Sequence, residues 1–126
     1  MTDGPGLSTA GEISRRSVQL LREYTGRGPT KARTVINHDS VLILLGDTLT
    51  PGERKLAESG KAEHVVDTRR QFQRIMRDDL VQVVEEATGR KVIAFMSDNH
   101  IDPDYGAEVF VLEPSGDANP RDGYEG

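Results

Sequence analysis

Residues 62–88, AEHVVDTRRQFQRIMRDDLVQVVEEAT, decide the fold because their apolar side chains recur at the period of one helix face. At about 100° per residue, the principal apolar positions fall within an arc of roughly 80°. They are Val65, Phe72, Met76, Leu80, Val83 and Ala87. Gly89 follows, and glycine readily takes the left-handed conformation that ends a helix. The stretch therefore predicts one helix of roughly 40 Å, long enough to cross a small sheet.

Two shorter helices are predicted on the N-terminal side. Thr9 and Glu12 have the spacing of a capping box, which predicts a helix from there to about Thr25, where Gly26 would end it. Its inward stripe would comprise Ile13, Ser17, Leu20, Leu21 and Tyr24. Thr50 and Glu53 form a second capping box with proline at the first helical position, so a short helix is expected to about Ser59.

Four strands are expected, at residues 32–37, 41–45, 92–97 and 107–112, with a polar loop over residues 98–106. Residues 41–45, VLILL, are apolar on both faces, which indicates a central strand or one whose second face a partner covers. The order α-β-β-α-α-β-β predicts an α+β fold with a four-stranded, mainly antiparallel sheet and its helices on one face. Residues 9–112 would form this single domain, between disordered segments at 1–8 and 113–126.

Composition narrows the function classes. The 126 residues contain no cysteine, which excludes disulfides and thiolate chemistry, and the net charge of −5 argues against nucleic-acid binding. No apolar run approaches the length of a membrane span, and the N-terminus lacks the pattern of a secretory signal. We therefore expect a cytoplasmic protein. Because the aliphatic core would be modest, we also expect a homodimer.

The turn after the first helix is a candidate anion or partner site. It comprises Gly26, Arg27, Gly28, Pro29, Lys31 and Arg33. Backbone amides together with arginine and lysine suit phosphate or carboxylate. Because the turn follows the C-terminus of a helix, whose dipole repels anions, the competing interpretation is a helix stop before a basic edge strand, with Gly28 in an unusual backbone conformation.

Arg69 falls inside the apolar arc of the long helix and joins the candidate site residues. A buried arginine needs an acidic partner, for which Asp47 or Asp98 are candidates at strand ends. The competing interpretation is that the guanidinium reaches solvent past its own apolar stem.

The acidic loop offers a weak metal candidate. Its possible ligands are Asp98, His100, Asp102 and Asp104, which alternate like the start of a calcium loop. Proline stands where such a loop needs glycine, and the glutamate of its last position is missing, so we expect no metal and no other cofactor. No nucleophile, base and acid occur at catalytic spacing, so we expect no enzyme, unless a site is completed across a dimer interface.

Several motifs resemble one bacterial family. They are residues 24–33 (YTGRGPTKAR), 47–53 (DTLTPGE), 88–92 (TGRKV) and 95–98 (FMSD). With these motifs, the chain from about Glu12 to Leu112 resembles the MpsC family, whose Gly-Arg-Gly-Pro element is the most specific piece. The loop carrying His100 and Asp102 looks like a variant of the family pattern.

The resemblance implies a part in a sodium-translocating, membrane-potential-generating system whose membrane components are linked to bicarbonate uptake. A non-catalytic accessory or regulatory subunit, peripheral to the inner face of the membrane and bound to a polytopic transporter subunit, would fit this chain. The basic segment from Arg15 to Arg33 could face that partner or anionic headgroups. The alternative is a homodimeric sensor that binds a small anion or a metal.

Overall fold

The computed structural model describes residues 8–29 and 31–114. In chain order the elements are α1 (Thr9–Thr25), β1 (Lys31–Asn37), β2 (Ser40–Gly46), α2 (Pro51–Leu56), a π-helical turn (Ala57–Lys61), α3 (Ala62–Thr88), β3 (Val92–His100) and β4 (Tyr105–Leu112). The predicted α+β class and the single long helix are confirmed. Most of the predicted disordered segments, at 1–7 and 115–126, lies outside the described residues.

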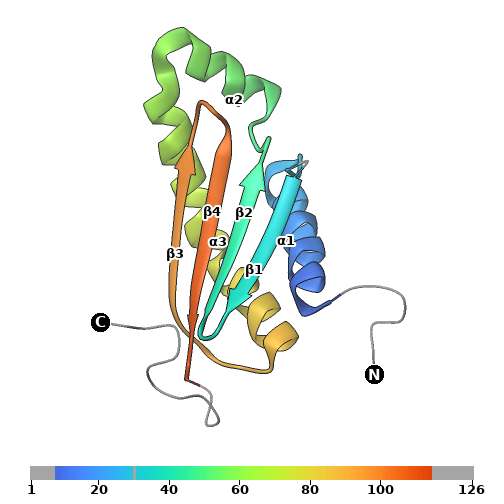
Figure 1. The fold of residues 1–126 in the computed structure, drawn as a ribbon. Helices are drawn as coiled ribbons and strands as arrows, with labels where there is room; N and C mark the ends of the chain where they lie inside the picture. The colour runs from blue at the N-terminus through green and yellow to red at the C-terminus, as the bar shows by residue number, and fades with distance from the viewer. Residues whose placement is uncertain (1–7, 30, 115–126) are drawn as a thin grey trace.

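The four strands form one antiparallel sheet in the order β1-β2-β4-β3. The apolar strand β2 is therefore internal, which is one of the two arrangements that its sequence indicated. Helices α1 and α3 lie side by side against one face of the sheet, and α2 sits beyond its upper end (Figure 1). The result is two layers, with the core between the helices and one sheet face.

The buried core is aliphatic apart from Phe110. Its buried members are Ile13, Leu21, Val41, Ile43, Leu45, Met76, Leu80, Val83, Val84, Phe110 and Leu112, with Phe95 partly buried against them. The predicted apolar arc of α3 is buried or partly buried, and Arg70, Arg74 and Arg77 on the opposite side are exposed. Two polar side chains are also buried on this side of α3, Arg69 within the arc and Gln73 just beyond its edge.

The helix ends follow the sequence signals with one exception. Thr50 and Glu53 form the predicted capping box, and Gly26 and Gly89 have positive φ at the ends of α1 and α3. The predicted Thr9 cap is wrong, because Ser8 accepts the hydrogen bond from the Gly11 amide and Thr9 is already helical. The carboxylate of Glu12 pairs with Arg15 instead.

The second hairpin is longer than predicted. β3 continues to His100 and β4 begins at Tyr105, so much of the predicted polar loop is paired strand. Asp98 and His100 are exposed and lie on the sheet face away from the helices. Their polarity therefore does not interrupt the ladder, and this is why composition alone misplaced the loop.

Candidate functional site

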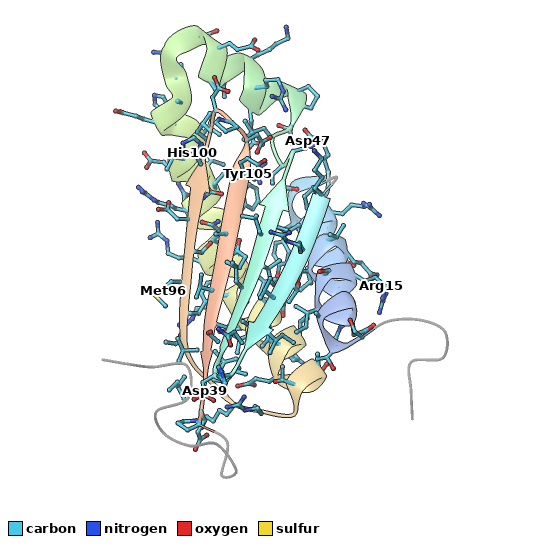
Figure 2. The ribbon with its side chains drawn as sticks, viewed as in Figure 1. Arg15, Asp39, Asp47, Met96, His100 and Tyr105 are labelled. Atoms are coloured by element: carbon cyan, nitrogen blue, oxygen red, sulfur yellow. The ribbon has the colours of Figure 1, made fainter. Side chains whose placement is uncertain are left out.

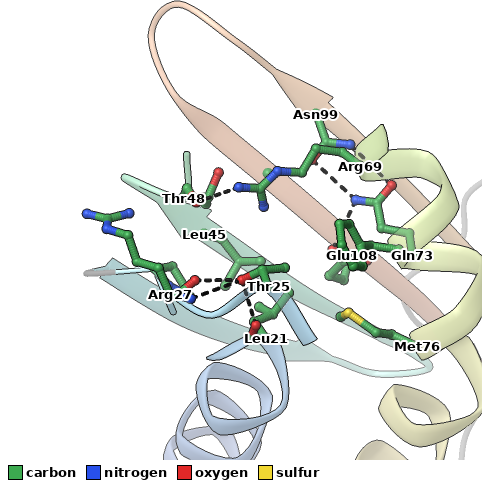
Figure 3. A pocket seen from close by; sticks show the side chains of 13 residues that line it. Leu21, Thr25, Arg27, Leu45, Thr48, Arg69, Gln73, Met76, Asn99 and Glu108 are labelled. Atoms are coloured by element: carbon green, nitrogen blue, oxygen red, sulfur yellow. Dashed lines mark hydrogen bonds between the residues drawn. The ribbon is translucent and has the colours of Figure 1, made fainter. Parts of the chain in front are cut away.

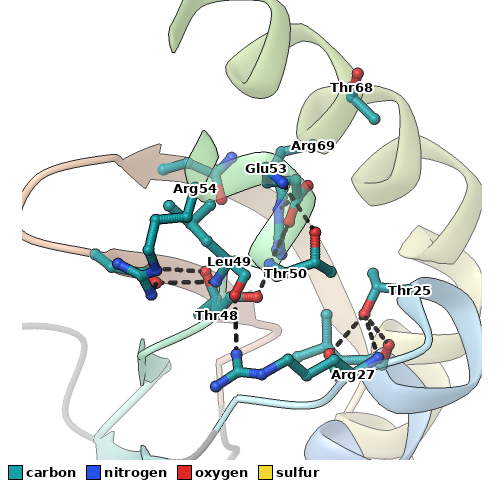
Figure 4. Close-up of polar contacts among 12 residues, drawn as sticks. Thr25, Arg27, Thr48, Leu49, Thr50, Glu53, Arg54, Thr68 and Arg69 are labelled. Atoms are coloured by element: carbon teal, nitrogen blue, oxygen red, sulfur yellow. Dashed lines mark hydrogen bonds and ion pairs between the residues drawn. The ribbon is translucent and has the colours of Figure 1, made fainter. Parts of the chain in front are cut away.

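At the upper end of the sheet, the turn after α1 meets the loop between β2 and α2. The Arg27 guanidinium donates to the Asp47 carbonyl oxygen at 2.7 Å and to the Asp47 carboxylate at 3.0 Å. It also donates to the Leu49 carbonyl oxygen at 3.1 Å (Figure 4). Arg27 therefore fixes the loop in which Asp47 takes a left-handed backbone conformation. The guanidinium N–H groups of Arg27, which were candidates for binding an external anion, are therefore used within the chain.

Arg69 holds the same loop from the other side. Its guanidinium donates to both carboxylate oxygens of Glu53, at 2.6 and 3.0 Å, and to the Thr48 carbonyl oxygen at 2.5 Å. The side chain of Arg69 is 7% exposed and that of Glu53 16%. The predicted need for an acidic partner is met, but the partner is neither Asp47 nor Asp98, because α2 brings Glu53 over the helix.

Asp104 closes this network from the second hairpin. Its carboxylate accepts from the Thr48 hydroxyl at 2.8 Å and from the Leu49 amide at 2.9 Å. Arg54 lies 3.3 Å from the Asp47 carboxylate and 3.5 Å from that of Asp104. Three arginines and three acids thus connect the loop of residues 47–50 to the turn after α1, to α2, to α3 and to the second hairpin, and the arrangement acts as a clamp.

The other residues of the predicted anion-binding turn are either buried or exposed on the surface. Gly28 and Pro29 are buried, and a Cβ on Gly28 would lie 3.2 Å from the Val18 carbonyl oxygen. Gly28 does not have positive φ, so its role is close approach to α1 and not the unusual conformation that was expected. Lys31 and Arg33 are exposed on β1.

The four weak metal candidates point to different surroundings. His100 Nδ1 lies 2.7 Å from the Pro103 carbonyl oxygen, whereas Asp104 faces the clamped loop. Figure 2 shows His100, Tyr105 and Asp47 at the same end of the sheet. Among residues 8–29 and 31–114, no cluster of three or more histidine or acidic side chains has metal-binding geometry.

A buried carboxyl group lies directly below the clamp. Glu108 is 1% exposed, and Gln73 donates to its Oε2 at 3.5 Å while exchanging hydrogen bonds with Asn99 (Figure 3). Its Oε1 has no hydrogen-bond partner in the described structure. Burial raises the pKa of Glu108 to about 7, against smaller opposing effects of Ser97, Gln73 and Arg69. The adjoining cavity, about 10 Å³, has room for roughly one water molecule.

A wide groove runs between α1 and the edge strand β1. Its volume is about 1020 Å³, and its lining includes Arg15, Arg22 and Arg33 beside the apolar Val18 and Ala32. Among the described residues that line it, none is acidic. Arg15 projects from the outer side of α1 in Figure 2. Of the features described, this groove is the best suited to hold another molecule.

Sequence reasoning missed Glu53, Gln73, Asn99 and Glu108 as members of these sites. For Glu108 a signal exists, because strict alternation from Gly106 to Leu112 places it among inward-facing residues. For Gln73 the signal is its place one helical turn after Arg69, next to the edge of the apolar arc. Glu53 gave no such signal, since its partner is set by how α2 packs.

Comparisons with known proteins agree with this fold and its motifs. Residues 8–114 match the family described as "Na+-translocating membrane potential-generating system (MpsC)". YbcI of Bacillus subtilis (strain 168), an uncharacterised protein, is 29% identical over 92 residues, which cover 72% of this chain and 74% of that relative. No solved structure matches. Within the described ranges, no helix combines the length and apolarity needed to cross a membrane. Because the family match spans both hairpins and all the helices, the chain belongs to the MpsC family.

Proposed function

We propose that this protein is a non-catalytic accessory or regulatory subunit of a membrane ion or bicarbonate transport system, acting from the cytoplasmic side. In this proposal, the groove between α1 and β1 binds an acidic segment of a polytopic membrane partner. The family description supports the membrane system, and the basic groove supports the mode of binding.

The charge of the groove is the observation that carries the proposal. The whole chain has a net charge of −5, yet this lining contains three arginines and no acid among its described residues. A local basic surface on an acidic protein attracts acidic segments of a partner. Arg22 makes no ion pair within the described residues and is exposed, so its charge is available to a partner.

The edge of the sheet gives the groove a second binding element. β1 is an outer strand, so its far side is not paired with another strand of this sheet. An extended peptide can add to such an edge through backbone hydrogen bonds, while neighbouring side chains give specificity. An acidic, extended segment would therefore gain backbone pairing from β1 and charge pairing from α1.

The test is recovery of the tagged chain from its native host in mild detergent. The expected result is co-purification with a polytopic membrane protein, and loss of that protein in the double variant Arg15→Gln and Arg22→Gln. The matched control is Arg74→Gln with Arg77→Gln, which removes the same charge from exposed positions on α3.

The proposal fails if the native chain is recovered without a membrane protein. It also fails if both double variants lose the partner equally, because the binding would then follow total charge and not the groove. Circular dichroism of each variant establishes that the fold is kept.

A further inference from the structure

The sheet face turned away from the helices is apolar across its centre. Strand alternation and register place on this open face Val35, Leu42, Leu44, Ala94, Met96, Ala107, Val109 and Val111. Val35 is 46% exposed, Leu42 37% and Met96 54%. Figure 1 shows both α1 and α3 on the opposite face. A contiguous exposed apolar surface of this kind marks a contact with another molecule.

Charges of opposite sign flank this apolar surface at the two edges of the sheet. The register aligns Arg33, Leu44, Ala107 and Asp98 in one row across the four strands. The next row contains Val35, Leu42, Val109 and Met96 and is entirely apolar. Arg33 and Asp98 are both exposed and lie on the two outer strands.

We propose that a second copy of this chain covers the open face, in a dimer whose twofold axis runs parallel to the strands. Such an axis reverses the strand order but keeps each row at its own height. Arg33 of one copy then lies over Asp98 of the other, and the large Leu44 lies over the small Ala107. The face is thus complementary to itself in charge and in size, as a symmetric interface requires.

The charge pattern selects this axis over the one that runs across the strands. A twofold axis perpendicular to the strands and midway between these two rows would place Arg33 over Val35, and Asp98 over Met96. Both charges would then lose water without gaining a partner, which is costly. Two sheets stacked with their strands nearly aligned lie about 10 Å apart, a spacing that side chains from both faces fill.

This inference goes beyond the proposed function and stands apart from it. The dimer uses the open face, whereas α1, which supplies Arg15 and Arg22 to the groove, lies on the other face. Arg33 lines the groove as well, so the groove is tested through the two α1 arginines and the dimer through the open face. Either proposal can fail while the other holds.

The first test is sedimentation equilibrium of the full chain. A chain of 13.9 kDa is expected to sediment at twice that mass at micromolar concentration. Val109→Glu places a charge at the centre of the open face and is expected to raise the dissociation constant by at least about 100-fold. The far-ultraviolet circular dichroism spectrum shows whether the variant keeps its fold.

The second test exchanges the edge charges, whose side chains are exposed, so the variants are expected to keep the fold. Arg33→Asp or Asp98→Arg alone is expected to raise the dissociation constant about tenfold, because symmetry makes two repulsive contacts from each substitution. The double variant Arg33→Asp with Asp98→Arg is expected to restore the native constant to within about threefold.

Three results would overturn the proposal. A native chain that remains monomeric at about 100 µM would show that a second copy does not cover this face. A Val109→Glu variant that is folded and still dimeric would place the contact elsewhere. Single charge variants that weaken the dimer without rescue in the double variant would exclude the axis parallel to the strands.

Discussion

The two faces of the sheet are made of the same strands but meet different surroundings. The helix-covered face buries Val41, Ile43, Phe110 and Leu112 and yet contains the carboxyl group of Glu108. The open face is solvated and yet apolar along its central rows. Each face therefore carries residues that oppose its environment. At these positions, packing within one chain does not explain why that type of residue is present.

Adjacent residues of β4 give the most direct test of this difference. Phe110 is fully buried, with its ring centroid 5.0 Å from that of Phe95, whereas Val109 faces the open side. Phe110→Ala is expected to lower the free energy of unfolding by about 3–5 kcal/mol, through lost burial and a cavity. Val109→Ala is expected to cost less than about 1 kcal/mol at concentrations where the chain is monomeric.

Urea unfolding of both variants makes this measurement. Similar losses in the two variants would show that both faces are packed within one chain, and the comparison would then be wrong.

The next largest loss of stability is expected when the clamp at the upper end of the covered face is broken. Arg69→Ala would leave the Glu53 carboxylate without its buried partner, and we expect a loss of about 3 kcal/mol. Arg70→Ala, one residue further on and exposed, is the control and should change stability by less than about 0.5 kcal/mol. Thermal unfolding compares them. A melting temperature unchanged in Arg69→Ala would mean that the ion pair does not secure the loop.

Much of the fold followed from local signals in the sequence. The 3.6-residue period of residues 62–88, the Thr50–Glu53 box and the glycines at 26 and 89 each specify a local conformation that tertiary packing leaves unchanged. The strand order could not be predicted, because β2 and β4 pair across a separation that includes α2 and α3. The ends of the second hairpin were misplaced because exposed polar side chains can continue a strand.

The buried carboxyl group of Glu108, on the helix-covered face, should make the stability of the fold depend on pH. Its pKa is about 7 in the folded chain and near 4.5 ordinarily, so between these values the folded state binds the proton that the unfolded state has lost. Stability contributed by the neutral carboxyl is therefore lost as pH rises from about 4.5 to 7. Glu108→Gln removes the titration and should gain about 2–3 kcal/mol relative to the native chain on going from about pH 5 to 8.

Melting temperatures of the two proteins across that pH range make the measurement. A difference that stays constant with pH would mean that Glu108 ionises alike in the folded and unfolded chains. Ser97→Ala keeps the Glu108 carboxyl but removes the effect of Ser97 that lowers its pKa, so this variant should keep the titration and move it to higher pH.

The candidate sites were less predictable than the fold. The sequence identified Arg27 and Arg69 as special, but their partners are Asp47 and Glu53, which only the packing of α2 and the β2–α2 loop brings near. Arg15 and Arg22 were visible as part of a basic segment. Their place on a common groove depends on how α1 lies along β1, and no local pattern encodes that angle.

The smallest change in the free energy of unfolding is expected on the open face, and there it should depend on protein concentration. Leu42→Thr introduces a β-branched side chain, which favours a strand, but removes apolar surface from a side chain that is 37% exposed. The monomer should lose less than about 1 kcal/mol, whereas Ile43→Thr, the neighbour on the covered face, should lose more because its hydroxyl is buried. Because dimerisation stabilises the folded state by mass action, the native melting temperature should rise with protein concentration, and Leu42→Thr should weaken that rise. If concentration has the same influence on both proteins, Leu42 contributes nothing to association, and its exposure is a tolerated feature of an ordinary surface.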